Sequence, residues 1–316
     1  MRCVGNAEVR RLVTMERAVD ALRSTFTEIG RSASPVFDCP PRLALGDGAT
    51  LVMTARHVPT GATVTKSLSV ELSRDPAIVG SVAWMDPLRT EPLVVEAAAV
   101  TTLRTGAIAG LGTDLLAPPD ADRMAIVGSG AQAPDQVRAV HAVRPLRELR
   151  VVSRRPENAE RLAASLRPEL PGTAITVAST VRDAVADMPI VTCATSAAEP
   201  VLDTVDLAPD AHVNGIGSFR PSMRELPEDL LAGAEVVMVE QRAAALEESG
   251  EIRHAVTTGG LRKDDVRELP DVLREPWQRS GGRTVFKSVG VGIHDWAVTR
   301  LIAETLDMPG VDSADV

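Results

Sequence analysis

The sequence contains no tyrosine, and aromatic residues make up only 2% of its 316 residues. Reductases that donate a proton from a Tyr-Lys pair are therefore excluded, and a catalytic acid must be Lys, His, Asp, Glu, Cys or water. Cysteine is also scarce: Cys3, Cys39 and Cys193 lack metal-ligand spacing, and Cys193 lies in an apolar run typical of a core strand. The five histidines are dispersed, so no metal site is expected.

Long apolar runs and basic blocks are missing as well. No apolar segment approaches the roughly 18 residues that a membrane-spanning helix needs, and no signal peptide is recognisable. We therefore expect a cytoplasmic protein with no membrane partner. The formal net charge of -9 and the absence of a Lys/Arg block argue against nucleic acid as a partner.

The most informative pattern that is present is a glycine-rich turn. Met124–Val127 has the composition of a buried strand, Gly128-x-Gly130-x-x-Ala133 follows it directly, and a helix-compatible stretch runs to about Val143. Gly128 permits a tight turn, Gly130 lets a pyrophosphate approach the backbone, and Ala133 lets the helix lie close to the strand. The helix N-terminus offers free N–H groups to phosphates. The pattern predicts a dinucleotide site formed by Gly128, Ser129, Gly130, Ala131, Gln132 and Ala133.

The end of the next strand indicates which dinucleotide binds. Ser153, Arg154 and Arg155 follow the strand at 149–153, and no acid appears before Glu157. An NAD site usually has Asp or Glu here for the ribose 2′-OH, whereas arginine suits a 2′-phosphate. We expect NADPH rather than NADH, with a solvated basic turn as the alternative interpretation of these arginines.

The organisation of the chain predicts an α/β protein with two domains. Helical spacing over 5–30 precedes short β-type runs separated by Gly, Pro and Asp turns, which indicate a largely antiparallel sheet. A helix over 96–116 leads to Pro118-Pro119, and strands then alternate with helices to about 240, as in a doubly wound parallel sheet. Residues 284–306 have a helical, apolar pattern. We expect a Rossmann domain over 119–284 and a discontinuous α+β domain over 1–118 and 285–316. The predicted strands are 43–45, 50–55, 63–70, 78–84, 124–127, 149–153, 175–178, 190–194, 211–216 and 236–239.

Four positively charged residues, Arg42, Lys66, Arg104 and Lys287, lie in or beside apolar runs. A buried cation is costly unless an anion compensates it, so each of them indicates an internal ion pair or an anionic ligand. Two converging arginines would bind a carboxylate in fixed geometry, and a desolvated lysine could give a proton to a substrate atom. Spacing alone does not show that these residues converge.

Several segments together resemble the ornithine cyclodeaminase/mu-crystallin family over nearly the whole chain. They include the Lys66 strand, the Gly128 loop, and stretches around Arg104, Thr195-Ser196, Gly217 and Lys287-Ser288. Further matches lie at 51–54, 199–200, 212–216, 223–226, 248–251 and Asp295.

The resemblance implies a Rossmann domain joined to a sheet-containing domain through which two subunits form a homodimer. It implies that Arg42 and Arg104 bind the substrate carboxylate and that Lys66 contacts the substrate as a catalytic residue. Met53 and Phe219 would line the substrate site. Thr195, Ser196, Gly217 and Asp295 would join the cofactor site, although Asp295 could instead be a helix N-terminal acid stabilised by the dipole.

One departure from the family pattern bears on the reaction. Cyclodeaminases carry an aspartate two residues after the glycine that matches Gly217, and Phe219 stands there in this chain. A phenyl ring cannot accept a proton from a substrate ammonium. The resemblance therefore favours reduction of a ketimine, such as a cyclic imino acid with C=N next to a carboxylate.

The leading hypothesis is an NAD(P)H-dependent reductase of an α-imino carboxylate that yields an amino acid. One alternative is an ornithine cyclodeaminase or an alanine-dehydrogenase-like amino-acid enzyme. The other is a non-catalytic NADPH-binding protein that resembles mu-crystallin. The presence of Arg42, Lys66 and Arg104 together favours an enzyme, because a passive binder has no need of all three.

Overall fold

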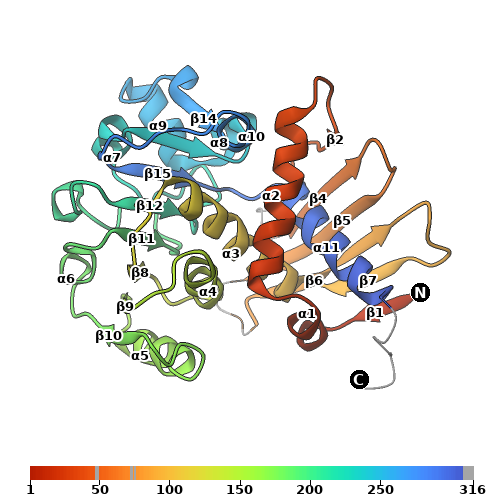
Figure 1. Cartoon of the computed structure of the whole chain (residues 1–316), viewed down its shortest axis with the longest axis horizontal. Coiled ribbons are helices and arrows are strands. Elements are labelled where there is room, and N and C mark those ends of the chain that lie inside the picture. The colour runs from red at the N-terminus through yellow and green to blue at the C-terminus, as the bar shows by residue number, and fades with distance from the viewer. Residues whose placement is uncertain (47–49, 72–73, 75, 309–316) are drawn as a thin grey trace. The chain divides into compact units, whose positions relative to one another are not determined.

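The computed structural model describes residues 1–46, 50–71, 74 and 76–308 (Figure 1). The chain divides into two compact units, Met1–Ala107 with Val291–Val316 and Ile108–Gly290. The first boundary lies inside helix α3 (Ala97–Leu116), before the predicted boundary at Pro118-Pro119. Residues 309–316 of the predicted C-terminal segment lie outside the described residues.

The first unit contains a mixed sheet in the order β1-β7-β6-β5-β4-β2, with β3 also paired to β4. Only β1 and β7 run parallel, so the predicted largely antiparallel sheet is present. The strands are β1 (Arg2–Val4), β2 (Phe37–Asp38), β3 (Leu43–Leu45), β4 (Thr50–His57), β5 (Thr63–Val70), β6 (Ile78–Met85) and β7 (Leu93–Glu96).

The N-terminal helical segment is divided in two. Helix α1 (Asn6–Leu12) ends before Thr14, and α2 (Met15–Arg31) begins after it. Thr14 is extended, with φ -80° and ψ 161°, and its hydroxyl accepts a hydrogen bond from the Arg17 N–H at 3.4 Å. The apolar spacing is continuous across this N-cap, which is why it predicted one helix over 5–30.

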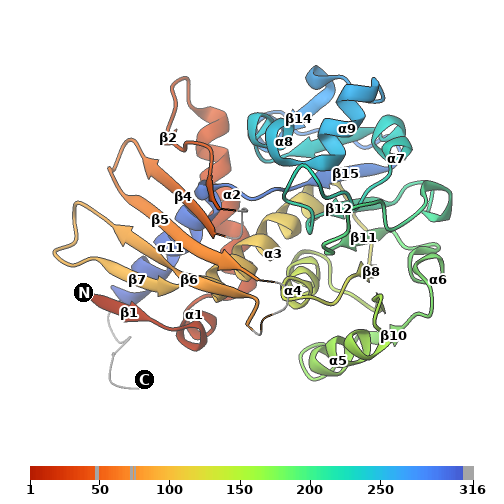
Figure 2. The same cartoon turned by 180° about the vertical axis from the view of Figure 1, so that it is seen from behind.

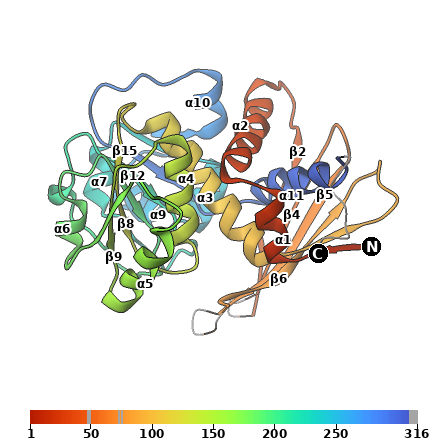
Figure 3. The same ribbon diagram turned by 60° about the horizontal axis from the view of Figure 1, so that its bottom comes forward.

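One face of the mixed sheet is covered by helices. Alternate residues of β4, β5 and β6 are buried, including Met53, Lys66 and Trp84. Helix α11 (Gly292–Leu306) packs on these three strands and against α2 (Figures 1 and 3). Figure 2 shows the opposite face of the strands, with α11 behind them.

Gly292 lets α11 begin in direct contact with β4. A Cβ atom at this position would lie 2.5 Å from the Thr54 carbonyl oxygen and 3.3 Å from the Ala55 Cβ. No larger residue fits this distance without moving the strand. The glycine therefore places the first turn of α11, which carries His294 and Asp295, directly over the sheet.

The second unit is built on an all-parallel sheet in the order β10-β9-β8-β11-β12-β15-β13-β14. All six predicted strands of this region lie in the sheet, with a helix between successive strands except between two of them, where only a 3-10 helix at Thr204–Asp206 intervenes. The predicted fold class is confirmed. The strands are β8 (Arg123–Val127), β9 (Glu148–Val152), β10 (Ala174–Val177), β11 (Ile190–Cys193), β12 (His212–Gly215), β13 (Val236–Val239), β14 (Val266–Glu268) and β15 (Thr284–Lys287).

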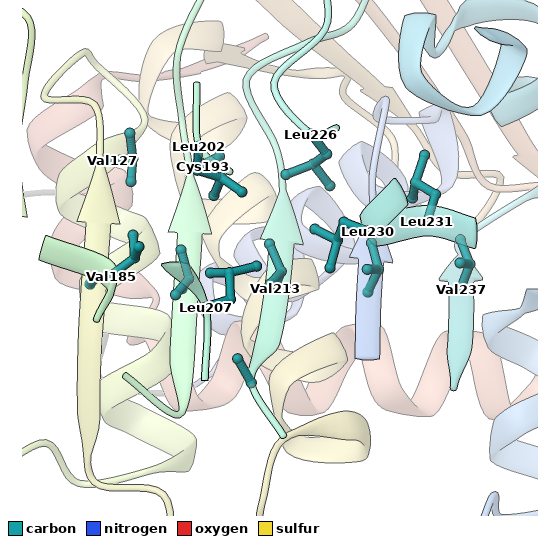
Figure 4. Close-up of a cluster of buried hydrophobic side chains, with 14 of the residues drawn as sticks. Val127, Val185, Cys193, Leu202, Leu207, Val213, Leu226, Leu230, Leu231 and Val237 are labelled. Atoms are coloured by element: carbon teal, nitrogen blue, oxygen red, sulfur yellow. The ribbon is translucent and has the colours of Figure 1, made fainter. Parts of the chain in front are cut away.

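Apolar side chains on both faces of this sheet explain why its strands are nearly continuous hydrophobic runs. Met124 and Ile126 of β8 join a cluster with α4 (Ala133–Val143) and α5 (Pro156–Leu166), whereas Ala125 and Val127 join a second cluster on the other face. Figure 4 shows Val127, Cys193, Val213 and Val237, from four strands of the sheet, in this second cluster. The helices are α4 (Ala133–Val143), α5 (Pro156–Leu166), α6 (Val181–Val185), α7 (Glu228–Gly233), α8 (Arg242–Glu248), α9 (Gly250–Thr258) and α10 (Leu269–Arg274), with short 3-10 helices at Thr204–Asp206 and Lys263–Asp265.

The prediction of a helical segment over 284–306 was wrong for its first part. Residues 284–287 form β15, which lies between β12 and β13 in the second unit, and the helix begins only at Gly292. A run of four buried residues has no periodicity that separates a strand from a helix. The sheet resolves the ambiguity, because β15 supplies the backbone partners of both neighbouring strands.

Candidate active site

Lys66 lies on the middle strand of the mixed sheet, with its side chain on the helix-covered face. Its neighbours across the sheet are Met53 on β4 and Val82 on β6, and all three are buried. The Lys66 side chain is fully buried, so its ammonium has lost all contact with bulk water. Such a group requires a charged or polar partner.

The partner of Lys66 is Asp295, in the first turn of α11. The Lys66 Nζ donates a hydrogen bond to Asp295 Oδ1 at 2.7 Å, and both side chains are fully buried. Arg104, on α3, approaches the same oxygen with its Nε at 3.5 Å. Two buried cations therefore share one carboxylate, and within the described residues this local cluster keeps one positive charge unmatched.

The electrostatics of this cluster lower the pKa of Lys66 from 10.5 to about 8. Burial is the largest cause, and repulsion from Arg104 comes next. Asp295 acts in the opposite direction, and Arg42 adds a smaller lowering effect. The three predicted cations Arg42, Lys66 and Arg104 are thus brought close enough to influence one titration, which spacing alone could not show.

His294 is a further residue of this cluster that the sequence did not indicate. It is fully buried, its ring lies tilted against Phe26 with ring centroids 5.6 Å apart, and neither ring nitrogen has a partner among the described residues. Burial, Arg104 and Lys66 hold its pKa well below the ordinary value, so the ring stays neutral. The one available signal was its position beside Asp295 at the start of a helix.

The arrangement can bind an anion and move a proton. A ligand carboxylate beside Arg104 and Arg42 would supply the negative charge that the cluster lacks, and an arginine fork fits a carboxylate in fixed orientation. Lys66 has a pKa close to neutral pH, so it can release its proton to a basic atom held beside it. Asp295 receives the Lys66 hydrogen bond, and its predicted role toward a cofactor stays a prediction.

The predicted dinucleotide turn has the geometry that such a ligand requires. Gly128 has φ +109°, and a Cβ there would lie 2.5 Å from the Ala194 carbonyl oxygen. A Cβ on Gly130 would meet nothing within 4 Å, so the backbone is open to a ligand there. Ala133 is buried at the first position of α4. These features fit a pyrophosphate at the carboxyl edge of the parallel sheet.

The end of β9 lies beside this turn. The Ser129 hydroxyl donates a hydrogen bond to the Ser153 hydroxyl at 2.8 Å, and the Gly128 N–H donates to the Val152 carbonyl at 2.9 Å. Arg154 and Arg155 follow Ser153 and are exposed. The structure therefore brings the glycine turn and the predicted ribose-binding residues together.

The other predicted cofactor residues lie on the next two strand ends of the same sheet. Thr195 and Ser196 follow β11, and Gly217 follows β12. A Cβ on Gly217 would lie 2.0 Å from the Thr195 carbonyl oxygen, so the two segments are in direct contact. Phe219 is half-buried in the segment after Gly217, with the Arg220 guanidinium 5.2 Å from its ring centroid.

Two other features limit what the chain can do. His212 is fully buried between Thr284 and Asn214, and burial lowers its pKa to about 3, so the ring is neutral and is not an acid that donates a proton.

Within the described ranges there is no group of three His, Cys, Asp or Glu side chains that could hold a metal ion. In the same part of the chain, no helix combines the length and apolar character needed to cross a membrane.

A glycine turn at the carboxyl edge of a doubly wound parallel sheet defines an α/β protein of the Rossmann class. The chain belongs to the ornithine cyclodeaminase/mu-crystallin family, whose model matches residues 6–308. The family predicted from the sequence is therefore confirmed.

Named relatives agree with this membership. The chain is 31% identical to a Delta(1)-pyrroline-2-carboxylate reductase of Bacillus cereus over 322 aligned positions, which cover 98% of each chain. It is 32% identical to the ketimine reductase mu-crystallin of Mus musculus over 73% of this chain and 70% of that protein. The Thermococcus litoralis Delta(1)-pyrroline-2-carboxylate reductase, solved with NADH and L-proline, superposes with a TM-score of 0.89 at 25% identity, covering 97% of both chains.

The shared carboxylate generates a prediction about stability. Asp295→Asn leaves Lys66 and Arg104 buried without their counter-charge, and we expect the free energy of unfolding to fall by about 3 kcal/mol. Urea unfolding followed by tryptophan fluorescence measures it, because Trp84 and Trp296 are both buried in the first unit.

The matched control is Glu304→Gln, which removes an exposed carboxylate from an ion pair on the same helix and should change stability by less than about 0.5 kcal/mol. In the double variant Lys66→Met/Asp295→Asn, we expect at least about 1 kcal/mol of the loss to be recovered. Equal stability of Asp295→Asn and the wild type would show that the cluster is not a coupled buried pair.

Proposed function

We propose that this protein is an NAD(P)H-dependent imine reductase that converts an α-imino carboxylate, such as a cyclic imino acid, into the amino acid. The observation that carries the proposal is the buried cluster of Lys66, Arg104 and Asp295. It combines an unmatched positive charge for a substrate carboxylate with a lysine whose pKa is about 8 for a substrate nitrogen. The B. cereus, T. litoralis and M. musculus relatives carry names for reactions of this kind.

The chain's own residues perform two tasks in this reaction. Arg104 and Arg42 bind the substrate carboxylate, which fixes the C=N bond in one orientation. Lys66 donates a proton from Nζ to the imine nitrogen, and Asp295 holds the Lys66 ammonium in place through its 2.7 Å hydrogen bond. When bound, NAD(P)H supplies the hydride that the imine carbon accepts. One proton and one hydride convert C=N into CH–NH, so the reaction balances.

The segment after β12 supports reduction over cyclisation of a diamino acid. Phe219 occupies the position where the family's cyclodeaminases carry an aspartate, and the only ionisable residue among 217–221 is Arg220. This segment therefore contains no base for a substrate ammonium. The alternative of a passive NADPH-binding protein is disfavoured, because a binder has no use for a buried lysine with a lowered pKa.

We propose NADPH as the preferred cofactor. Arg154 and Arg155 stand at the end of β9, where a 2′-phosphate would lie, and no acid stands beside them before Glu157. The T. litoralis relative was solved with NADH, so the preference rests on these arginines alone.

We also propose a homodimer formed through the open face of the mixed sheet. Of the twelve residues of β4, β5 and β6 on that face, seven are Ser or Thr, four are apolar, and Arg56 is charged. Val79 and Met85 on this face are 48% and 52% exposed. The cores of protein–protein interfaces are depleted in charged residues, and this face has the same property. The cytoplasmic location expected from the sequence stays a prediction.

The first test of the proposed function is direct turnover. Purified protein with NADPH and Δ1-pyrroline-2-carboxylate or Δ1-piperideine-2-carboxylate should lose the absorbance of the reduced nicotinamide and form the cyclic amino acid. Arg104→Ala should lower kcat/KM about 100-fold, because one partner of a buried charged contact is removed. The NADPH Kd should stay unchanged. The control Arg300→Ala removes an exposed arginine from α11 and should leave both values unchanged.

Two results would contradict this function. Absence of turnover with both rings and with open-chain imines would reject the reductase. Ammonia release from ornithine with catalytic cofactor would establish a cyclodeaminase instead.

The pKa of Lys66 generates a pH prediction. The protonated amine is the proton donor, so kcat/KM should fall about tenfold for each pH unit above about pH 8. Unfolding does not explain such a fall. Between pH 8 and 10.5 the unfolded state binds more protons at Lys66 than the folded state, so this group's contribution to stability rises with pH.

The variant Lys66→Gln distinguishes the titration of Lys66 from the titration of the substrate imine in this pH profile. Its activity should be low, and any alkaline limb that remains belongs to titration of the imine itself. A wild-type limb that is unchanged in position and steepness in Lys66→Gln would remove Lys66 from the role of proton donor.

The cofactor preference can be tested at the β9 end. In Arg154→Ser/Arg155→Ser, we expect the ratio of kcat/KM for NADPH to that for NADH to fall by about 10- to 100-fold, as for lost charge-assisted hydrogen bonds. Arg161→Ser, an exposed arginine on α5, is the matched control and should keep the ratio. Equal kcat/KM values of the wild-type enzyme for NADH and NADPH would contradict the preference.

A further inference from the structure

A second buried charge cluster lies in the parallel-sheet unit and has no part in the proton transfer described above. Its centre is Glu225, which is completely buried. One carboxylate oxygen of Glu225 accepts a hydrogen bond from the Thr195 N–H at 2.5 Å. The other oxygen accepts hydrogen bonds from the Gly217 N–H at 2.6 Å and the Ser218 N–H at 3.0 Å. A single side chain thus ties the segment after β11 to the segment after β12.

These two segments flank the dinucleotide turn. Ala194 touches Gly128 closely enough that a Cβ on Gly128 would lie 2.5 Å from its carbonyl oxygen. Thr195 lies closer still to Gly217, where a Cβ would be 2.0 Å from the Thr195 carbonyl oxygen. The three strand ends after β8, β11 and β12 therefore form one contiguous layer of backbone at the carboxyl edge. Small displacements of one segment would disturb the next, because there is no space between them.

Two further buried residues, Lys287 and Glu251, form hydrogen bonds with Ser218 and Glu225. Lys287, at the end of β15, donates hydrogen bonds to the Ser218 carbonyl and to its hydroxyl, both at 2.6 Å. The Ser218 hydroxyl donates to Glu251, which also accepts the Glu225 N–H at 2.8 Å. Lys287 Nζ lies 3.7 Å from Glu251, and both side chains are fully buried.

The pKa values of the two carboxyl groups in this cluster are shifted in opposite directions. Burial raises the pKa of Glu225 above its ordinary value, although Lys287 and the Thr195 N–H oppose the shift. Burial acts the same way on Glu251, but Lys287 and hydrogen bonds from Ser218 and the backbone outweigh it, so its pKa is lowered. Glu251 is thus the ionised partner of Lys287. The carboxylate oxygens of Glu225 accept hydrogen bonds from backbone N–H groups of the segments after β11 and β12.

The strand order shows which part of a dinucleotide these segments would face. In a doubly wound sheet each half binds one mononucleotide, and the ligand crosses the edge where the strand order reverses. Here the order reverses between β8 and β11. Ser153 on the β9 side faces the adenosine half, so Thr195 and Gly217 on the β11–β12 side face the nicotinamide half.

We propose that Glu225, supported by Lys287 and Glu251, is a positioning residue that fixes the Thr195 and Gly217–Ser218 segments as the seat of the nicotinamide half of NAD(P)H. The inference rests on the proposed function for the identity of the ligand. The buried side chains of Glu225, Lys287 and Glu251 would determine where the backbone of Thr195 and Gly217–Ser218 lies, although they would not contact the cofactor themselves.

The test compares a whole cofactor with its adenosine half. Glu225→Gln keeps the shape of the side chain but turns an NH2 group toward backbone donors. NADPH Kd, measured by quenching of protein fluorescence, should rise about tenfold, as expected when a buried hydrogen-bond partner is replaced. The Kd for adenosine 2′,5′-bisphosphate should stay unchanged. The KM for NADPH should rise, while the KM for imine at saturating NADPH should not.

The matched control is Glu240→Gln. Glu240 is also buried at a strand end and accepts hydrogen bonds from the Ser288 hydroxyl and the Val289 and Gly290 N–H groups. It should lose stability as Glu225→Gln does and keep the wild-type NADPH Kd. If Glu225→Gln does not fold, Ser218→Ala is the second variant: it removes the hydroxyl that bridges Lys287 and Glu251 and leaves their direct ion pair in place. It should raise the Kd for NADPH by about threefold and leave the Kd for the bisphosphate unchanged.

Three results would overturn the inference: an unchanged NADPH Kd in the folded variant, an equal weakening of NADPH and the bisphosphate, or an equal weakening of NADPH in Glu240→Gln. The proposed function fails separately, when the wild type binds NADPH but reduces no imine.

Discussion

The ion pair between Lys66 and Asp295 is the interaction on which the first unit depends. It joins β5 of the mixed sheet to the first turn of α11, and both side chains are fully buried. Removing either partner would leave a buried charge uncompensated, so sheet and helix are held in one relative position. Because Arg104 shares the same carboxylate, the three side chains together carry an unmatched positive charge. That charge favours the binding of a further anion. Structural cohesion and affinity for a carboxylate thus come from the same atoms.

The two units bury basic and acidic side chains in opposite proportions. The first unit has two cations around one carboxylate, which favours an anionic ligand. The second unit has Lys287 with the two carboxylates of Glu225 and Glu251, whose oxygens accept backbone N–H groups from adjoining segments. An unmatched positive charge favours an anionic ligand, whereas the carboxylate oxygens of the second unit hold backbone N–H groups of adjoining segments in place.

Much of the fold could be predicted from the sequence, because its signals are local. The strands at 63–70 and 236–239 have the predicted bounds, and the glycine turn follows its strand directly. The sequence did not suffice where tertiary context decides, and the helix predicted over 284–287 was wrong for this reason. Residues 284–287 are apolar in either secondary structure, and only the sheet makes them a strand. The convergence of Arg42, Lys66 and Arg104 depends on the packing of α3 and β5, which no spacing encodes. Glu225 and Glu251 resemble surface acids in sequence, and only their burial reveals their role.

The separation of Lys66 and Asp295 along the chain has a consequence for how the protein is made. The two residues are 229 positions apart, and the second unit lies entirely between them. Domains fold as units while a chain is synthesised from its N-terminus. The dinucleotide fold therefore has all its strands before α11 has left the ribosome, and the first unit waits with Lys66 unpaired. A nascent or truncated chain ending before Gly292 would possess every strand of the parallel sheet but would lack Asp295, the partner of Lys66. If the proposed function holds, such a chain could bind the dinucleotide before it could reduce an imine.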